Sequence, residues 1–183
     1  MDQKPSPRLP QLHPAAAAAW PEIAVPLEQF CRHVEERLGD AASALTEERA
    51  RDLYLACACA HGVAHAVEAF ESHYGPVIEA GLASLSVPAG LVDDIRQTIR
   101  HRLLVAEAGE RPKIAEYSGR GSFEAWLYVV TVRLALNRVR GERRLVATAD
   151  EQLENLLSEV DTWVRGGGAD EPVRGGRDGG RAR

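Results

Sequence analysis

The sequence predicts an all-α protein, folded as a compact helical bundle with disordered termini. Alanine, leucine, arginine and glutamate dominate the 183 residues, whereas isoleucine, threonine and phenylalanine, which favour strands, are sparse. Apolar side chains make up 45% of the chain and recur at helical spacing in several segments. This amount is sufficient for one ordinary core, so we expect one helical domain with loose ends.

Charge, cysteines and hydropathy restrict the class of protein. The net charge is −5, yet residues 96–144 carry eleven Lys/Arg against five Asp/Glu, a local charge of +6, which leaves −11 for the remainder. Three cysteines are an odd number and do not predict a disulfide framework. The sequence contains neither a membrane-length apolar run nor a signal-peptide pattern, so we expect a cytoplasmic protein without a membrane partner.

The N-terminal third divides into an arm and a helical extension. Six prolines fall within residues 1–26, and we interpret this segment as a disordered arm. Residues 27–50 form the expected extension, with an amphipathic helix from Leu27 to Leu38 that ends at Gly39. Thr46 is the expected N-cap of a further helix that runs towards Gly62.

Residues 51–144 are the expected main domain, and its first two amphipathic helices follow each other closely. The first covers 63–85, and Gly75-Pro76 is expected to bend or split it. Its apolar stripe consists of Val67, Phe70, Tyr74, Ile78, Leu82 and Leu85. The second has an apolar face of Leu91, Ile95, Ile99 and Leu103. Its opposite, polar face presents Asp94, Gln97, Arg100 and His101.

The third helix of this domain is expected from about Phe123 to Arg140, with Ser122 as its cap. Its predicted buried stripe is Phe123, Leu127, Val130 and Leu134. Arg133, Asn137, Arg140 and Arg144 fall on one face and form a polar ladder suited to a polyanion, if the helix persists. The rings of Tyr117, Phe123, Trp126 and Tyr128 flank this ladder and would stack on bases where exposed, although Phe123 is expected to be buried.

After this domain we expect a short amphipathic helix over 145–165 and a disordered Gly/Arg tail over 166–183.

Two groups of reactive side chains have structural alternatives. Asp93 and Asp94 point in different directions around a helix and lack a completing group, so they favour a helix start over catalysis. Cys57, His61 and His65 would share one helical face with Glu68 a turn further on, which could suit zinc. The alternative is that they fill a helix interface, since the usual two separated ligand pairs are not found. We therefore expect no metal, no cofactor and no enzymatic activity.

Residues 67–74, residues 94–97 and residues 119–140 form three elements whose order and spacing agree with one known pattern: they resemble region two of extracytoplasmic-function sigma factors. Residues 119–140, Gly-Arg-Gly-Ser-Phe-Glu-Ala-Trp-Leu-Tyr through Arg-Leu-Ala-Leu-Asn-Arg-Val-Arg, resemble that family's glycine-serine turn, Trp-Leu pair and arginine-rich helix. Asp94-Ile95-Arg96-Gln97 is similar to its Asp-Leu-Val-Gln, and residues 67–74 resemble its Ala-Phe-x-x-x-Tyr helix. Residues 53–60 and 114–121 look like a subfamily abundant in myxobacteria.

The resemblance implies a transcription initiation protein with two macromolecular partners. Its polymerase-binding face would dock on the clamp helices of the largest subunit of core RNA polymerase through Asp94, Gln97, Arg100 and His101. Its DNA-binding face would recognise the single-stranded, melted minus-ten promoter element through Tyr117, Arg120, Ser122, Trp126, Arg133, Asn137, Arg140 and Arg144. An anti-sigma factor is a further candidate partner.

One departure from the family keeps an alternative open. A complete factor has a second helical domain, region four, whereas only about 20 residues with a helical pattern follow Arg144 here. The glycine- and arginine-rich tail is compatible with a natural linker or with a truncated or frame-shifted reading frame. The alternative function is therefore a decoy or regulatory interaction protein that docks on polymerase or an anti-sigma factor without directing initiation.

Overall fold

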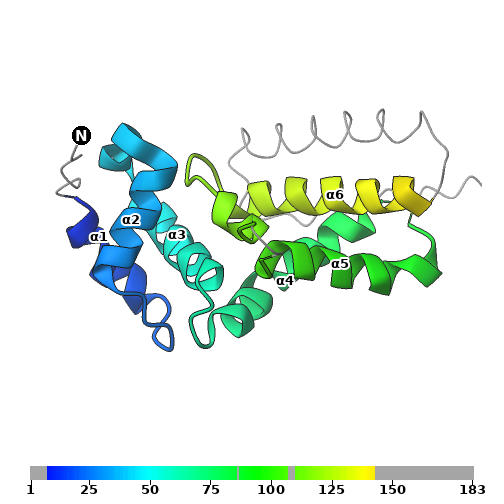
Figure 1. The fold of residues 1–183 in the computed structure, drawn as a ribbon, viewed down its shortest axis with the longest axis horizontal. Coiled ribbons are helices and arrows are strands. Elements are labelled where there is room, and N and C mark those ends of the chain that lie inside the picture. The colour runs from blue at the N-terminus through cyan, green and yellow to red at the C-terminus, as the bar shows by residue number, and fades with distance from the viewer. Residues whose placement is uncertain (1–7, 86, 107–109, 143–183) are drawn as a thin grey trace, which may run out of the picture.

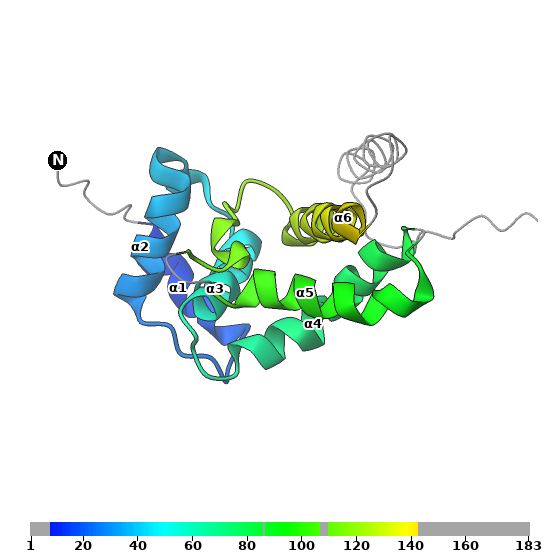
Figure 2. The ribbon, with the colours of Figure 1, turned by 45° about the vertical axis from the view of Figure 1, so that its right-hand side comes forward.

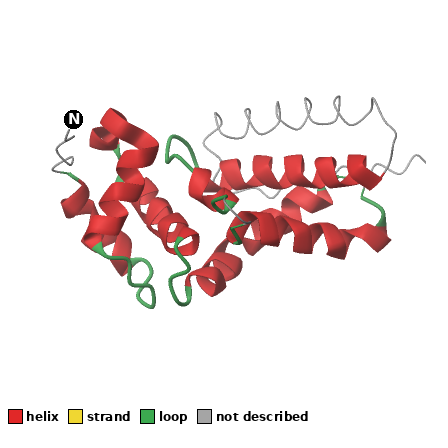
Figure 3. Cartoon of the chain, in the orientation of Figure 1, coloured by secondary structure: helices red, strands yellow, loops and turns green. Residues whose placement is uncertain are grey.

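The computed structural model describes residues 8–85, 87–106 and 110–142, and within these ranges all regular structure is helical (Figure 3). The elements fall into two neighbouring groups (Figure 1). The first group comprises α1 (Leu9–Ala18), α2 (Leu27–Leu38), the 3-10 helix η1 (Gly39–Ala44) and α3 (Glu47–Ala60). The second comprises α4 (Ala66–Ala83), η2 (Ala89–Leu91), α5 (Val92–Leu104), η3 (Lys113–Glu116) and α6 (Phe123–Glu142). The prediction of an all-α protein is confirmed.

Helix α3 lies at the centre of the fold. Every side chain from Leu53 to Cys59 is buried, and the helix packs against α1, α2, α4 and η3. Its start is the predicted one, because the Thr46 hydroxyl accepts a hydrogen bond from the Arg49 amide at 3.4 Å. Residues 50 and 51 are consecutive within α3, so this helix spans the expected boundary between the extension and the main domain.

The expectation that residues 1–26 form a disordered arm is wrong for residues 8–26. Helix α1 buries Leu9, Leu12 and Ala16 against the core. Beyond it, the hydroxyl of Tyr54 donates to the Ile23 carbonyl oxygen at 3.0 Å and accepts from the Val25 amide at 2.9 Å. Proline content is misleading here, because Pro10 in the first turn of α1 removes no hydrogen bond and Pro14 lies inside the helix without ending it.

The remaining helices follow the predicted pattern, and the differences described here concern α4. Helix α2 has its expected bounds, and Gly39 follows it with a φ of +52°. Helix α4 begins at Ala66, after His65 adopts a φ of +63°, and Pro76 lies inside it without dividing it. Of the expected apolar stripe of α4, Val67 is exposed, whereas Phe70, Tyr74, Ile78 and Leu82 are buried.

A buried polar contact joins the two groups of helices. The hydroxyl of Tyr74 on α4 donates to the Oδ1 atom of Asp52 on α3 at 2.7 Å. Burial raises the pKa of Asp52, and the hydrogen bond from Tyr74 opposes that rise. The Tyr74 ring also packs edge-on against Phe123 at 4.7 Å, so this contact lies directly beside the start of α6.

Within the described ranges, no helix combines the length and the apolar character that crossing a bilayer requires. The helix expected over 145–165 and the tail expected over 166–183 lie outside the described residues.

Candidate functional site

Helix α6 is fixed against α4 and α5, and both views show it lying over these two helices (Figures 1 and 2). Phe123, Leu127 and Val130 are buried as predicted. Gly81 permits the close approach of α4, since a Cβ at that position would lie 2.9 Å from Cγ2 of the buried Thr131. Residues on the exposed side of α6 are therefore presented from a rigidly packed helix.

The predicted polar ladder is partly described. Helix α6 persists through Arg133, Asn137 and Arg140, which places these three side chains on one helical face. Arg133 and Asn137 are exposed and Arg140 is half-buried, whereas Arg144 lies outside the described residues. The described face thus offers two guanidinium groups and one amide to a ligand.

The predicted polymerase-binding face lies on α5. Ile95, Ile99 and Leu103 are buried as expected, and the opposite face exposes Gln97 and His101. Arg100 is also exposed but lies 3.3 Å from a carboxylate oxygen of Glu71 on α4. Gln97 and His101 are consequently the side chains of this face that are best placed to contact a partner.

A salt bridge joins α5 to α6. Asp94 on α5 accepts a hydrogen bond from the Nη2 atom of Arg138 on α6 at 2.8 Å. The Asp94 side chain remains 51% exposed, so the pair lies at the surface and not in the core. Asp94, a predicted polymerase-binding residue, therefore already pairs with Arg138 of α6.

A second ion-paired group borders the α5 face. The guanidinium of Arg96 donates two hydrogen bonds to Glu79 on α4, at 2.6 and 2.9 Å, and also contacts the carboxylate of Asp93. The bond from Arg96 holds the pKa of Glu79 below its usual value. Arg96, which interrupts the resemblance to Asp-Leu-Val-Gln, therefore pairs within the chain.

Two of the rings expected to stack on bases are not free to do so. Tyr117 is 1% exposed, its hydroxyl donates to the Gly121 carbonyl oxygen at 2.7 Å, and its ring meets Phe123 edge-on at 4.7 Å. Trp126 is half-buried and stacks on Phe123, with 5.5 Å between the ring centroids. Tyr117, a predicted DNA-binding residue, is therefore one of the buried rings, and the predicted burial of Phe123 is confirmed.

The loop before α6 is held against α3. Gly119 has a φ of +68°, and a Cβ there would lie 2.7 Å from the Cδ1 atom of Leu53. Next to it, Arg120 is exposed. Ser122 is half-buried, and its hydroxyl accepts from the Ala125 amide at 3.4 Å, as expected of a helix cap. Of the predicted DNA-binding loop residues, Arg120 is therefore the one that faces outward.

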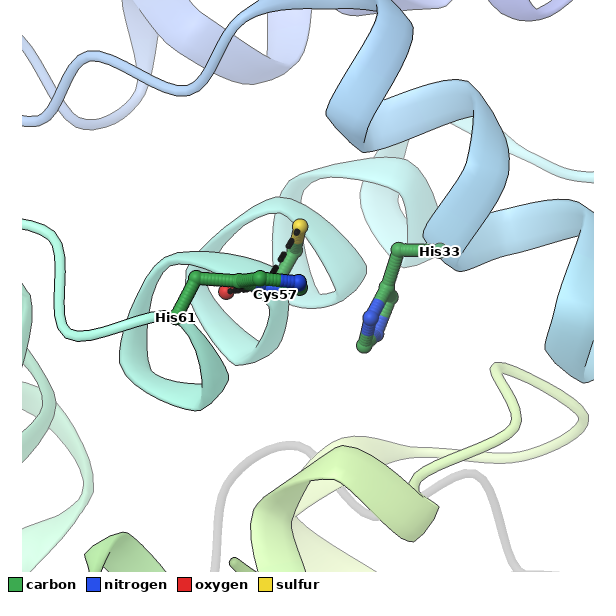
Figure 4. A group of neighbouring side chains, drawn as sticks. All are labelled: His33, Cys57 and His61. Carbon is green, nitrogen blue, oxygen red and sulfur yellow. Dashed lines mark hydrogen bonds between the residues drawn. The ribbon is translucent and has the colours of Figure 1, made fainter. Parts of the chain in front are cut away.

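The set of possible zinc ligands in the structure differs from the set that the sequence spacing suggested. Helix α3 ends at Ala60 and His65 lies beyond a left-handed turn, so Cys57, His61 and His65 do not share one helix as the spacing suggested. His33 of α2 instead joins Cys57 and His61, and one potential ligand atom from each lies within 4.8 Å of the others (Figure 4). Sequence reasoning missed His33, although it directly precedes the apolar Val34 on the core face of α2.

Burial alters the acid-base properties of this trio. Desolvation, followed by the nearby charges of Arg37 and His61, lowers the pKa of His33 to about 4. Desolvation also raises the pKa of the Cys57 thiol to about 12, with a further contribution from Glu36. At neutral pH His33 is thus an uncharged imidazole.

Comparison of the chain with family models, with curated proteins and with solved structures finds no match.

Proposed function

We propose that this chain is a sigma-like transcription initiation protein, whose α5 face binds core RNA polymerase and whose α6 face binds the melted minus-ten promoter strand. The proposal rests on the resemblance of residues 67–140 to sigma region two. The observation that carries it is the placement of the resembling segments on adjacent helices, α4, α5 and α6, with Gln97 and Arg133 both exposed.

Polymerase docking is supported by the polar surface of α5. A helix with a buried apolar face needs no particular residue on its solvent side, but this one presents an amide and an imidazole at neighbouring positions, Gln97 and His101. Such groups can form hydrogen bonds across an interface without the desolvation penalty of a buried charge. Their partner in the proposal is the pair of clamp helices in the largest polymerase subunit.

DNA binding is supported by the guanidinium groups of Arg120, Arg133 and Arg140. Arginines that track a phosphate backbone release condensed counterions, and this release gives an affinity that falls steeply with salt. Asn137 adds an amide between the two α6 arginines, where it can bond to a base edge or to a sugar. Since Tyr117 is buried, base capture in this proposal uses the outward rim of the loop at Arg120 and not the tyrosine ring.

The DNA-binding half is tested by the salt dependence of binding to a single-stranded minus-ten oligonucleotide. Arg133→Ala should weaken binding and reduce the slope of log K against log salt by about 0.7, the contribution of one contact to single-stranded DNA. The matched control is Arg32→Ala, because Arg32 is an exposed arginine on α2 in the other group of helices. Equal slopes for Arg133→Ala and the unmodified protein would contradict the assignment of α6.

The polymerase-binding half is tested by measuring the affinity for core RNA polymerase. Gln97→Ala should reduce this affinity and leave single-stranded DNA binding unchanged, and Gln11→Ala, an exposed glutamine on α1, is the control. Equal affinities for Gln97→Ala and Gln11→Ala would remove α5 as the docking face.

A further inference from the structure

We infer that His33, Cys57 and His61 form a binding site for Zn²⁺ between α2 and the end of α3. This inference is independent of the proposed function, because none of the three residues belongs to the α5 or α6 faces. The sequence pairs Cys57 with His61 by their helical spacing, but it gives no signal for His33, which lies far upstream on another helix.

The geometry brings the three groups together from two directions. Figure 4 shows His33 projecting from α2 towards the side chains of Cys57 and His61, which lie one helical turn apart at the end of α3. The Sγ atom of Cys57 lies 3.7 Å from Nδ1 of His61 and 3.9 Å from the Gln29 carbonyl oxygen of α2. The rings of His33 and His61 meet edge-on with 6.0 Å between their centroids.

A buried nitrogen of His33 that lacks a hydrogen-bond partner is evidence for a ligand, independent of the geometry. His33 is only 3% exposed, and its buried Nε2 atom has no hydrogen-bond partner in the structure. Buried polar atoms of folded proteins are almost always hydrogen-bonded, because an unpaired one loses its hydration without replacement. A metal ion held by Cys57 and His61 would give this nitrogen the partner that it lacks.

The donor set selects the class of metal. A thiolate with two imidazoles suits zinc, whereas calcium and magnesium require oxygen ligands that the trio does not offer. Zinc–ligand bonds of about 2.0–2.3 Å place tetrahedral ligand atoms roughly 3.3–3.8 Å apart. One ligand atom from each of the three residues lies within 4.8 Å of the others, so small side-chain rotations would bring them to tetrahedral separations.

The surroundings of the trio carry charges of both signs, with Arg37 near His33 and Glu36 near both His33 and Cys57. The Nδ1 atom of His61 donates to the Cys57 carbonyl oxygen at 2.8 Å, the type of bond that orients metal-binding imidazoles, and this leaves Nε2 of His61 as the ligand atom. The carboxylate of Glu36, which is paired with Arg111 at 2.8 Å, interacts electrostatically with both His33 and Cys57. On binding, the Cys57 thiol releases its proton to solvent and its sulfur coordinates as the thiolate. Three protein ligands leave one position of a tetrahedral zinc site for water.

A bound ion would crosslink α2 to α3. Helix α2 otherwise depends on the burial of Phe30, Val34 and Leu38, and the metal would add a bond between two helices that the unfolded chain cannot form in advance. Saturating zinc should therefore raise the thermal midpoint of the full chain by about 5 °C.

The test is a titration of the chelator-treated full chain with Co²⁺, whose thiolate complexes have a charge-transfer absorption, followed by displacement with Zn²⁺. The chain should bind one Co²⁺ with this absorption, and zinc should remove it. Cys57→Ala should abolish the absorption, whereas Cys59→Ala should retain it, because Sγ of Cys59 instead donates to the Ala66 carbonyl oxygen at 3.3 Å.

Two histidine variants separate this site from the one suggested by sequence spacing. His33→Ala should weaken metal binding by at least about tenfold, and His65→Ala should leave it unchanged. His61→Ala, at an exposed position where folding is not at risk, should also weaken binding, and circular dichroism verifies the fold of each variant. Absence of thiolate absorption in the unmodified chain, its retention in Cys57→Ala, or equal affinities for His61→Ala and the unmodified chain would each overturn the inference.

Discussion

Replacement of Gly119 by alanine is the sharpest perturbation that the structure offers for the loop before α6. Two independent features oppose a side chain at this position. The backbone has a φ of +68°, where residues with a Cβ are strained, and the new methyl would lie 2.7 Å from Cδ1 of Leu53. Leu53 is fully buried in α3, so it has little space into which it can move.

The two features allow the size of the effect to be worked out. A residue other than glycine in the left-handed region costs about 1–3 kcal/mol. Inserting a methyl into a packed core costs about 1–3 kcal/mol more, because neighbouring side chains must leave their preferred rotamers. We therefore expect Gly119→Ala to lower the free energy of unfolding by about 2–6 kcal/mol, a large part of the 5–15 kcal/mol typical of a domain.

Urea unfolding followed by circular dichroism measures this loss, and the loop supplies its own control. A Cβ at Gly121 would meet nothing within 4 Å and the backbone there is not left-handed, so Gly121→Ala should change stability by less than about 0.5 kcal/mol. Leu53→Ala should make the Gly119→Ala loss smaller, since the truncated side chain leaves room for the new methyl. If both glycine variants unfolded at the same urea concentration, the loop would not be held against α3.

Three further predictions concern the helix contacts and their pH dependence. Tyr74→Phe should destabilise the protein by about 1–3 kcal/mol at pH 7, because it strips the hydrogen-bond donor from the buried Asp52 carboxylate. Folding raises the pKa of Asp52 above 3.8, so the contribution of Asp52 to stability is present below pH 3.8 and is lost as pH rises through the folded pKa. The loss of stability caused by Tyr74→Phe, measured by urea unfolding at several pH values, should therefore shrink on acidification. A loss that stays constant with pH would contradict the contact. Gly81→Ala should cost about 1–3 kcal/mol, since its Cβ would lie 2.9 Å from the buried Thr131, and an unchanged thermal midpoint would mean that α4 and α6 are further apart. Gly75→Ala in the same helix is the control: apart from its chain neighbours a Cβ there would meet no atom within 4 Å, and its helix-propensity gain of about 0.5–1 kcal/mol is opposed by the ring of Pro76, so its loss in urea unfolding should be smaller than that of Gly81→Ala. An equal loss would show that α4 is distorted at this point.

The sequence was sufficient for those features that depend on local pattern. Helical spacing located α2, α5 and α6, and Thr46 and Ser122 marked helix starts, because capping and amphipathicity act over a few residues. The polar face of α5 could likewise be read from the sequence, since Ile95 and Ile99 fix which side of that helix is buried.

Features that depend on distant contacts could not be predicted in the same way. The burial of Tyr117 results from the packing of its ring on Phe123 and from a hydroxyl bond to Gly121, which no periodicity reveals. The ion pair between Asp94 and Arg138 joins residues on two helices, and the approach of His33 to Cys57 depends on how α2 crosses α3. For the same reason, proline content led to the wrong prediction of a disordered arm where the apolar residues of α1 pack against α3.

The most direct test of the proposed function is a reconstituted transcription assay with core RNA polymerase and a template that bears a minus-ten element. The proposal predicts that the full chain binds core polymerase and directs initiation, and that Gln97→Ala reduces initiation through weaker polymerase binding. Binding to core polymerase with suppression of a competing sigma factor, and no initiation, would contradict the initiation role and favour a decoy. Failure of the chain to bind core polymerase would contradict the proposed function as a whole.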